Sequence, residues 1–397
     1  MDETALEGAV GHRVSVQRKL AGLTQQQLAV RAHVSTSLVA QVEQGAVPAS
    51  AAFTAAVARV LGVEVDALTG EPYGPPITDP RAEHAGIPAL RAVLDNDQDP
   101  DFEGFPMPAA ALRARLDHCQ AQSDNARYAA VAATLPELLN HCYAVADHAG
   151  PDHGAWTLLV DGYELAQLVS HRFGYLDLAA LAARCGRDAA NRVDDPRRAA
   201  VAAVRFTDLR LRRGDYPGVL RALDRAHRLI ENHRCPTAHA VRIHLHLRQA
   251  LTHARAGATD QADEHLGAAR ELLTPGVPQR PYHGVWASPV IVDLHSVATA
   301  VELSDGMTAL SRAQQVQLPD DTPPCYAAEH WITVARAWTL HGDRANALTA
   351  LHQARRVAPQ LTRYHPDVHQ TVHLLAEHDR RATDSLAGFT RWLGVPR

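Results

Sequence analysis

The chain has 397 residues, more than one compact core usually holds, so we expect two or more folded units. Its formal net charge of −5 excludes a strongly basic protein and counts mildly against nucleic-acid binding. Five scattered cysteines argue against a disulfide framework and for a reducing compartment. The start is acidic, with no secretion signal, and no run of eighteen apolar residues is present. We therefore predict a cytoplasmic protein without a membrane partner.

Two short helices joined by a tight turn are predicted near the N-terminus. Thr24 can cap the first helix through its hydroxyl, and Gln27 completes a capping box. Ser35 caps the second helix in the same way. Gly45 suits the left-handed residue that follows this helix, and Pro48 keeps the helix from resuming.

The second of these helices would present an uncharged outer face. The side chains expected there are Thr36, Ser37, Ala40, Gln41 and Gln44. A helix that serves only solubility usually carries Lys and Glu, whereas approach to base edges favours short polar or amide groups. The pattern therefore predicts a DNA-recognition helix. A helical domain that uses the same caps for stability alone would leave the outward amides unexplained.

The stretch from about Gly11 to Leu68 resembles the Xre/Cro-type helix-turn-helix family. The matching pieces are Leu23-Thr24-Gln25, Leu28-Ala29, Val34, Ser35 to Gly45, and Leu61-Gly62-Val63. The resemblance implies a five-helix, lambda-repressor-like domain over residues 1–70 that binds a double-stranded DNA operator.

The resemblance also assigns roles to single positions. Gln25 would hold a phosphate, and Arg13 and Lys19 would lie near the DNA backbone. Thr36, Ser37 and Gln41 would approach the bases, and Ser35 belongs to the same DNA-binding set. Arg18 would pair with Glu43 to lock the first helix against the recognition helix. Residues 1–70 carry five bases against six acids, so one copy should bind weakly. A homodimer on an inverted repeat would compensate.

Residues 71–106 form a predicted linker that is rich in proline and acidic residues, interrupted by one short helix around Ile87 to Leu94. Alternating acids from Asp95 to Glu103 invite a calcium-loop interpretation. That interpretation fails, because Pro100 stands where such a loop needs glycine and Pro106 where it needs a bidentate Glu.

From residue 107 to 397 the pattern is helical and repetitive. Marker glycines recur between a long and a shorter predicted helix at Gly174, Gly214, Gly257 and Gly342, and a degenerate unit is expected near Gly306. Small residues recur five and twelve positions after most of these glycines, as closely crossing helices require. The last unit resembles the tetratricopeptide repeat, with Trp331, Trp338 and Pro359 at family positions. The resemblance implies an all-α superhelix with a concave groove. An unrelated helical array is the alternative.

Polar side chains are expected in this groove. The candidates are Arg172, Asp208, Arg212, His244, Arg255 and Arg336. Guanidinium groups grip carboxylates and carbonyls, so the groove suits a peptide or a small acidic ligand. Alternatively, the arginines simply stabilise helix C-termini. Both interpretations stay open here.

Catalytic signatures such as G-x-S-x-G, H-E-x-x-H and G-x-G-x-x-G are missing, and the single lysine lies outside any glycine loop. His244 and His246 point to different sides of a helix and cannot share a metal. We expect no enzyme, no cofactor and no metal. The leading hypothesis is a transcriptional regulator whose repeats dimerise and sense a ligand, in the manner of peptide-responsive Xre regulators. The alternative is a protein–protein adaptor with an auxiliary helix-turn-helix domain.

Overall fold

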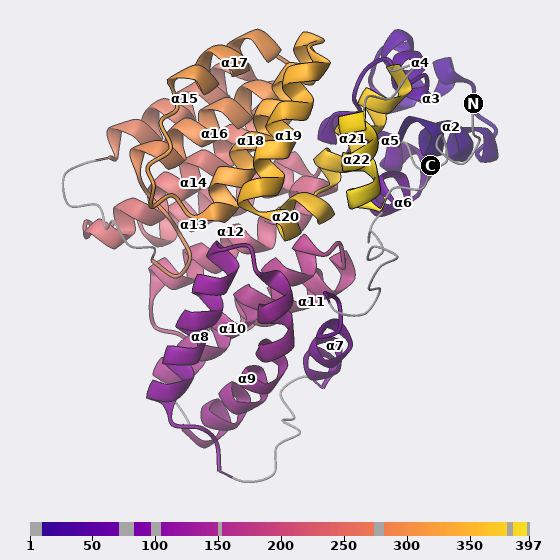
Figure 1. Cartoon of the computed structure of the whole chain (residues 1–397). Coiled ribbons are helices and arrows are strands. Elements are labelled where there is room, and N and C mark those ends of the chain that lie inside the picture. The colour runs from indigo at the N-terminus through magenta and orange to yellow at the C-terminus, as the bar shows by residue number, and fades with distance from the viewer. Residues whose placement is uncertain are drawn as a thin grey trace.

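The computed structural model describes residues 10–70, 83–96, 105–149, 153–273, 282–378 and 384–394. Within these ranges every named element is a helix, and the sole strand-like feature is an isolated bridge between Tyr282 and Val285. The predicted all-α class is therefore confirmed. Figure 1 shows a small N-terminal unit beside a larger helical array, with the last helices of the chain between them.

Over residues 10–70 the N-terminal unit, which we call the head, contains five helices. They are α2 (Val10–Leu20), α3 (Gln25–Ala32), α4 (Thr36–Glu43), α5 (Ala51–Leu61) and α6 (Val65–Thr69). Leu28, Val39 and Phe53 meet in one apolar core with Leu68 from the last helix. Gly11 is required there, because a Cβ at this position would lie 2.0 Å from the Val42 carbonyl oxygen. The five-helix head predicted from the sequence is confirmed.

The array begins with α7 (Ile87–Asp95), the short helix expected inside the linker. Ile87, Leu90 and Leu94 are buried in the same core as the helices that follow, and α7 packs against α9 and α11. The stretch of the predicted linker that covers 97–104, with most of its alternating acids, lies outside the described residues.

Helix pairs build the rest of the array. The pairs are α8 (Ala109–Asp124) and α9 (Tyr128–Ala149), α10 (His153–Arg172) and α11 (Leu176–Ala190), α12 (Pro196–Arg212) and α13 (Tyr216–Leu229), α14 (Pro236–Arg255) and α15 (Thr259–Glu271), α16 (Pro289–Glu302) and α17 (Gly306–Gln315), and α18 (Pro324–His341) and α19 (Arg344–Val357). The chain ends with α20 (Pro359–Tyr364), α21 (Pro366–His378) and α22 (Asp384–Leu393).

The repeat predicted from glycine spacing matches these pairs. Each of the four marker glycines has a positive φ at the turn between paired helices. The small residues that follow them at both repeat positions are buried: Ala179, Val219, Ala262, Ala347, Gly186, Ala226, Ala269 and Ala354. The degenerate unit near Gly306 is the pair α16–α17. There Ser304, with φ 61°, takes the left-handed turn position, and Gly306 starts the second helix instead.

The array closes on itself, because its first and last units pack together. Phe173 at the end of α10 lies edge-on against Tyr364 of α20, with ring centroids 5.2 Å apart. His84, just before α7, stacks on Phe173 at 4.6 Å. The amide of Ala129 donates to the side chain of Gln360 at 3.2 Å. A single apolar core therefore joins α7–α11 to α18–α22, rather than an open stack with two free ends.

The head rests on the array at two places. Gln370 of α21 donates from Nε2 to the carbonyl of Ala49 at 2.6 Å, in the loop after α4. Arg59 of α5 donates to the carbonyl of Gly214 at 3.2 Å. A Cβ on Gly214 would lie 2.7 Å from the Cβ of Ala55, so this marker glycine also lets the head approach closely.

The aromatic contacts of Phe173 with Tyr364 and His84, which we call the aromatic seam, should stabilise the closed array. We expect Phe173→Ala to lower the free energy of unfolding by about 3–5 kcal/mol, because it empties a fully buried ring site between the two ends of the array. Urea unfolding of the intact chain measures this value. The matched control is Phe105→Ala, whose side chain is 97% exposed and should cost less than about 0.5 kcal/mol. Equal losses in the two variants would contradict the closed arrangement.

Candidate nucleic-acid interface and array interior

The turn between α3 and α4 is fixed by local hydrogen bonds. The Thr24 hydroxyl accepts from the amide of Gln27 at 3.1 Å, and the Gln27 side chain accepts from the amide of Thr24 at 2.9 Å. His33 ends α3 in the left-handed region, with φ 55°. The Ser35 hydroxyl then accepts from the amide of Leu38 at 3.1 Å and caps α4. These contacts set the angle between the two helices without help from the array.

A buried ion pair holds α4 against α2. Arg18 donates from Nε and Nη2 to the two carboxylate oxygens of Glu43, at 2.6 and 2.9 Å. Its third nitrogen, Nη1, donates to the carbonyl of Leu23. The ion pair expected between these residues is therefore present, and its fork geometry gives it directional strength. Burial opposes ionisation of Glu43, but the bonds from Arg18 and Gln25 lower its pKa below the usual value.

Gln25 belongs to the same network. Its Nε2 donates to Glu43 Oε2 at 2.9 Å, so the side chain braces α3 against the end of α4. Its expected role at a DNA phosphate stays a prediction, and the described contact is internal. Arg13 is also turned inward: its guanidinium donates to the carbonyls of Leu68 and Thr69, both at 2.7 Å. In this structure Arg13 closes the C-terminal end of α6, whereas Lys19 is exposed.

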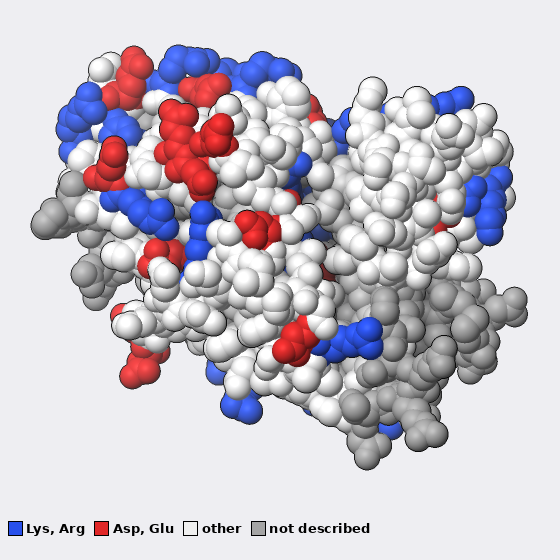
Figure 2. All heavy atoms as spheres, turned by 90° about the horizontal axis from the view of Figure 1, so that it is seen from above, with Lys and Arg blue, Asp and Glu red and all other residues white. Residues whose placement is uncertain are grey.

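The outer edge of α4 faces solvent. Ser35, Thr36, Ser37, Gln41 and Gln44 are all exposed. The array touches the head elsewhere, at the loop after α4 and at α5. In Figure 2 the lobe that contains the head is mostly uncharged, and the charged side chains gather over the array. The predicted base-reading side chains therefore lie together on one accessible, uncharged edge.

The arginines expected to line the groove do not form a bare basic ladder. Arg172 pairs with Glu329 of α18 across the closure. Arg255 and Arg336 both donate to Glu302, with closest contacts of 3.2 and 2.9 Å. Burial opposes ionisation of Glu302, but the two facing arginines lower its pKa to about 2. These three guanidinium groups are thus already neutralised within the protein.

The remaining groove candidates lie in the same interior. Asp208 pairs with Arg248 of α14 and accepts from Gln167 of α10. His244 is half-buried, and burial lowers its pKa to about 3, so it is neutral at physiological pH. Arg212 ends α12, with a guanidinium nitrogen shielded from solvent. The carboxylates that pair with Arg172, Arg255 and Arg336 are Glu329, Glu302 and Asp367, and a ligand-binding role for the groove candidates stays a prediction.

Glu302 and Asp367 were not expected in the groove, whereas Glu329 shares the repeat position of His244, thirteen residues before its marker glycine. Glu302 and Asp367 bind arginines of neighbouring units, whereas Glu329 binds Arg172 from a unit distant in sequence, a pairing that repeat spacing does not indicate. A buried carboxylate as the last residue of α16 is the one local hint, because a negative charge at a helix C-terminus requires a cationic partner. Among the described residues, no group of three or more His, Cys, Asp or Glu side chains is arranged to hold a metal.

Comparison with known proteins decides the family. A family model described as a helix-turn-helix domain matches residues 9–69. The immunity repressor protein of Bacillus phage phi105 is 31% identical over 117 residues, which cover 27% of this chain and 80% of the repressor. The chain belongs to the helix-turn-helix family. The family prediction made from the sequence is confirmed, and the head is its helix-turn-helix domain.

A solved structure also matches this chain over most of its length. It is Bacillus thuringiensis PlcR in complex with the peptide PapR7 and DNA, with 88% of this chain and 94% of that chain covered. The two sequences are 10% identical and the TM-score is 0.28, which is too low to establish a shared arrangement of helices. No helix among the described residues is long and apolar enough to cross a membrane.

The buried pair in the helix-turn-helix head predicts a specific weakness. Glu43→Gln should leave Arg18 buried without a counter-charge and lower the local stability of α4 by about 3 kcal/mol. Amide hydrogen exchange of α4 in the intact chain measures this change. Glu64→Gln is the control, because its pair with Arg213 is exposed and 3.6 Å long.

Acidification should act on the same pair. The pKa of Glu43 is lowered by folding, so its stabilising effect is present above its unfolded pKa of 4.5 and is lost as the pH falls below that value. In Glu43→Gln this part of the pH dependence should disappear. Protection of α4 that falls equally with pH in both proteins would contradict the assignment.

Proposed function

We propose that this protein is a sequence-specific, DNA-binding transcriptional regulator that acts in the cytoplasm. The observation that carries the proposal is the exposed, uncharged edge of α4, which the array leaves uncovered. Ser37 and Gln41 lie one turn apart on this helix, where short polar and amide groups can hydrogen-bond to base edges in the major groove. Ser35 and Thr36 open the same helix and would contact the bases or the adjacent phosphate.

We further propose that two copies act together on an inverted repeat. The described head carries few bases, namely Arg13, Arg18, Lys19, Arg31 and Arg59, and the first two are engaged internally. Electrostatic attraction to phosphates is therefore weak for one head. Pairing two heads raises the effective concentration of the second and restores affinity. We place the dimer interface on the surface of the array, which is the larger of the two units.

The array is the proposed sensor of a peptide or a small acidic ligand. Its support is the row of inward arginines, because such groups recognise carboxylates. Since each of Arg172, Arg255 and Arg336 is already paired, a ligand would enter by exchange with a protein carboxylate and not by filling an empty basic site. Binding would then bias the position of the head by shifting a population between arrangements.

Operator selection tests the DNA-binding proposal. Genomic fragments retained by the intact protein should contain a common inverted repeat. Gln41→Ala and Ser37→Ala should each weaken binding to that repeat about tenfold, while binding to random duplex stays unchanged, because each loses base contacts only. Gln315→Ala, on an exposed site of α17, is the matched control and should bind like the wild type.

Two results would count against this proposal. If the retained fragments share no sequence, the protein does not bind a specific operator. If both Gln41→Ala and Ser37→Ala keep selective binding, α4 is not the helix that contacts the bases. Either result would favour the adaptor, in which the closed array docks a partner protein.

A further inference from the structure

A chain of contacts runs from the array interior to the head. Arg336 of α18 donates from Nη1 to Glu302 at 2.9 Å, and the same nitrogen lies 3.1 Å from Oδ2 of Asp367. Asp367 is the second residue of α21. Three residues further on, Gln370 holds the carbonyl of Ala49 in the head. One guanidinium therefore connects a buried carboxylate to the helix that carries the head.

The two carboxylates on Arg336 differ in how easily they can leave. The side chain of Glu302 is 3% exposed and has a second partner in Arg255, so removing it would strand buried charge. The side chain of Asp367 is 30% exposed and can return to water at small cost. Arg336 itself remains 18% exposed. Asp367 is thus the exchangeable partner of this arginine.

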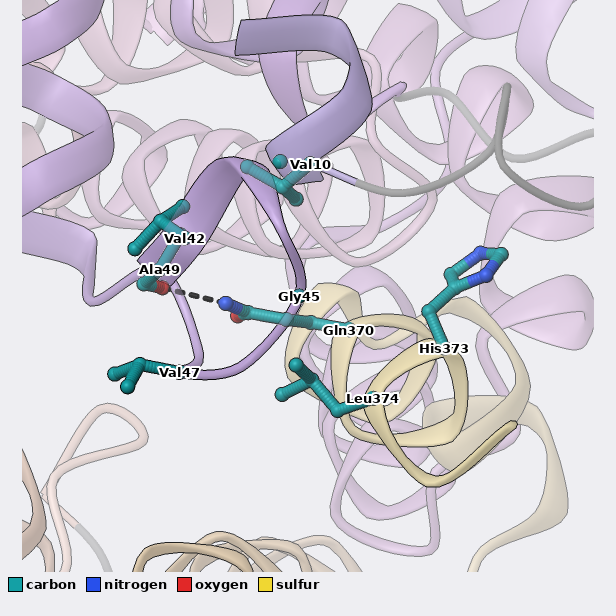
Figure 3. A pocket seen from close by; sticks show the side chains of 9 residues that line it. Val10, Val42, Gly45, Val47, Ala49, Gln370, His373 and Leu374 are labelled. Atoms are coloured by element: carbon teal, nitrogen blue, oxygen red, sulfur yellow. Dashed lines mark hydrogen bonds between the residues drawn. The ribbon is translucent and has the colours of Figure 1, made fainter. Parts of the chain in front are cut away.

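The helix α21 transmits what happens at Asp367. Positions 367, 370 and 374 lie along one side of this helix, because they are three and seven residues apart. Gln370 and Leu374 line a cavity of about 20 Å³ between α21 and the head, together with Gly45 and Val47 of the loop after α4 (Figure 3). Figure 3 shows Gln370 extended into this loop with Leu374 beside it. A small rotation or shift of α21 would therefore move the loop that directly follows the recognition helix.

We propose that Arg336 is a carboxylate-binding site and that Asp367 occupies it as an internal substitute for the ligand. A ligand carboxylate displaces Asp367, leaves Glu302 in place, and frees the first turn of α21. The hold of Gln370 on the loop 44–50 then weakens, and the head gains freedom to change its orientation. This inference rests on the proposed ligand-sensing function and names the site, the ligand chemistry and the element that moves.

Replacing Asp367 by a ligand carboxylate leaves the charge beside Arg336 unchanged. One carboxylate leaves Arg336 and another takes its place, so the buried guanidinium keeps a counter-ion throughout. A ligand can shift the equilibrium only by the difference in binding free energy at Arg336 between its own carboxylate and that of Asp367. Asp367 is the more exposed of the two carboxylates on Arg336, so replacing it costs less than replacing Glu302.

The experiment follows amide hydrogen exchange in the intact protein without DNA, at α21 and at residues 45–49. Asp367→Asn removes the internal carboxylate and keeps its shape, and should speed exchange there about two- to fivefold. Asp188→Asn is the matched control, because this exposed acid pairs only with its neighbour Arg187 among the contacts described. Unchanged exchange in Asp367→Asn relative to this control overturns the proposal.

Two probes test the ligand site itself. Glutarate represents a small acid, and acetyl-trialanine represents a peptide C-terminus, with its C-terminal amide as the uncharged control. In the wild type, either or both free carboxylates should speed exchange at 45–49, and in Asp367→Asn they should add nothing further. An effect of the amide equal to that of the free acid, or no effect of either acid while Asp367→Asn acts, overturns the assignment of Arg336. Because no DNA is present, these outcomes are independent of whether an operator exists.

Discussion

The contact between the two ends of the array is the constraint on which the rest of the structure depends. A stack of helix pairs normally has two free ends, each with an apolar face to cover. Here Phe173, Tyr364 and His84 join the ends through one aromatic seam. Closure brings α18 against α8 and α10, so arginines of one unit face carboxylates of another. It also fixes α20, which contacts α21, and Gln370 of α21 in turn bonds to the head.

The interior is rich in charge and yet largely neutral, because its arginines face carboxylates of neighbouring units and, for Arg172, of the opposite end of the array. Burying a guanidinium is costly unless a carboxylate accompanies it, and the array supplies one to each of Arg172, Arg255 and Arg336. Such pairs contribute little net stability compared with apolar packing, but removing one partner is expensive. They therefore favour one arrangement of the units over others. Asp367 is more exposed than Glu302, which is why the proposed ligand exchange is placed there.

The sequence predicts those parts of the structure that are set locally. The caps at Thr24 and Ser35, the turn at His33 and the glycine-marked repeat depend on neighbours a few residues away, and all were predicted. The pair of Arg18 and Glu43 came from a family resemblance and not from spacing. By contrast, the closure joins residues more than 150 positions apart, and no periodicity reports it. Arg13 was expected near the DNA backbone; here its guanidinium donates to two carbonyls at the end of α6, which its position in the sequence did not reveal, and its role at DNA stays a prediction. Ser304 has a positive φ where the other pairs carry a marker glycine, so glycine spacing alone did not locate this turn.

The central claim is that the uncharged edge of α4 reads the major groove in two heads at once. Chemical interference on selected genomic fragments tests this claim most directly, by methylating guanine N7 in the major groove and adenine N3 in the minor groove. We expect major-groove methylation to block binding at two symmetric half-sites, whose centres lie about one helical turn or a multiple of it apart on one face of the duplex. Interference confined to the minor groove, or at a single unpaired site, would contradict it.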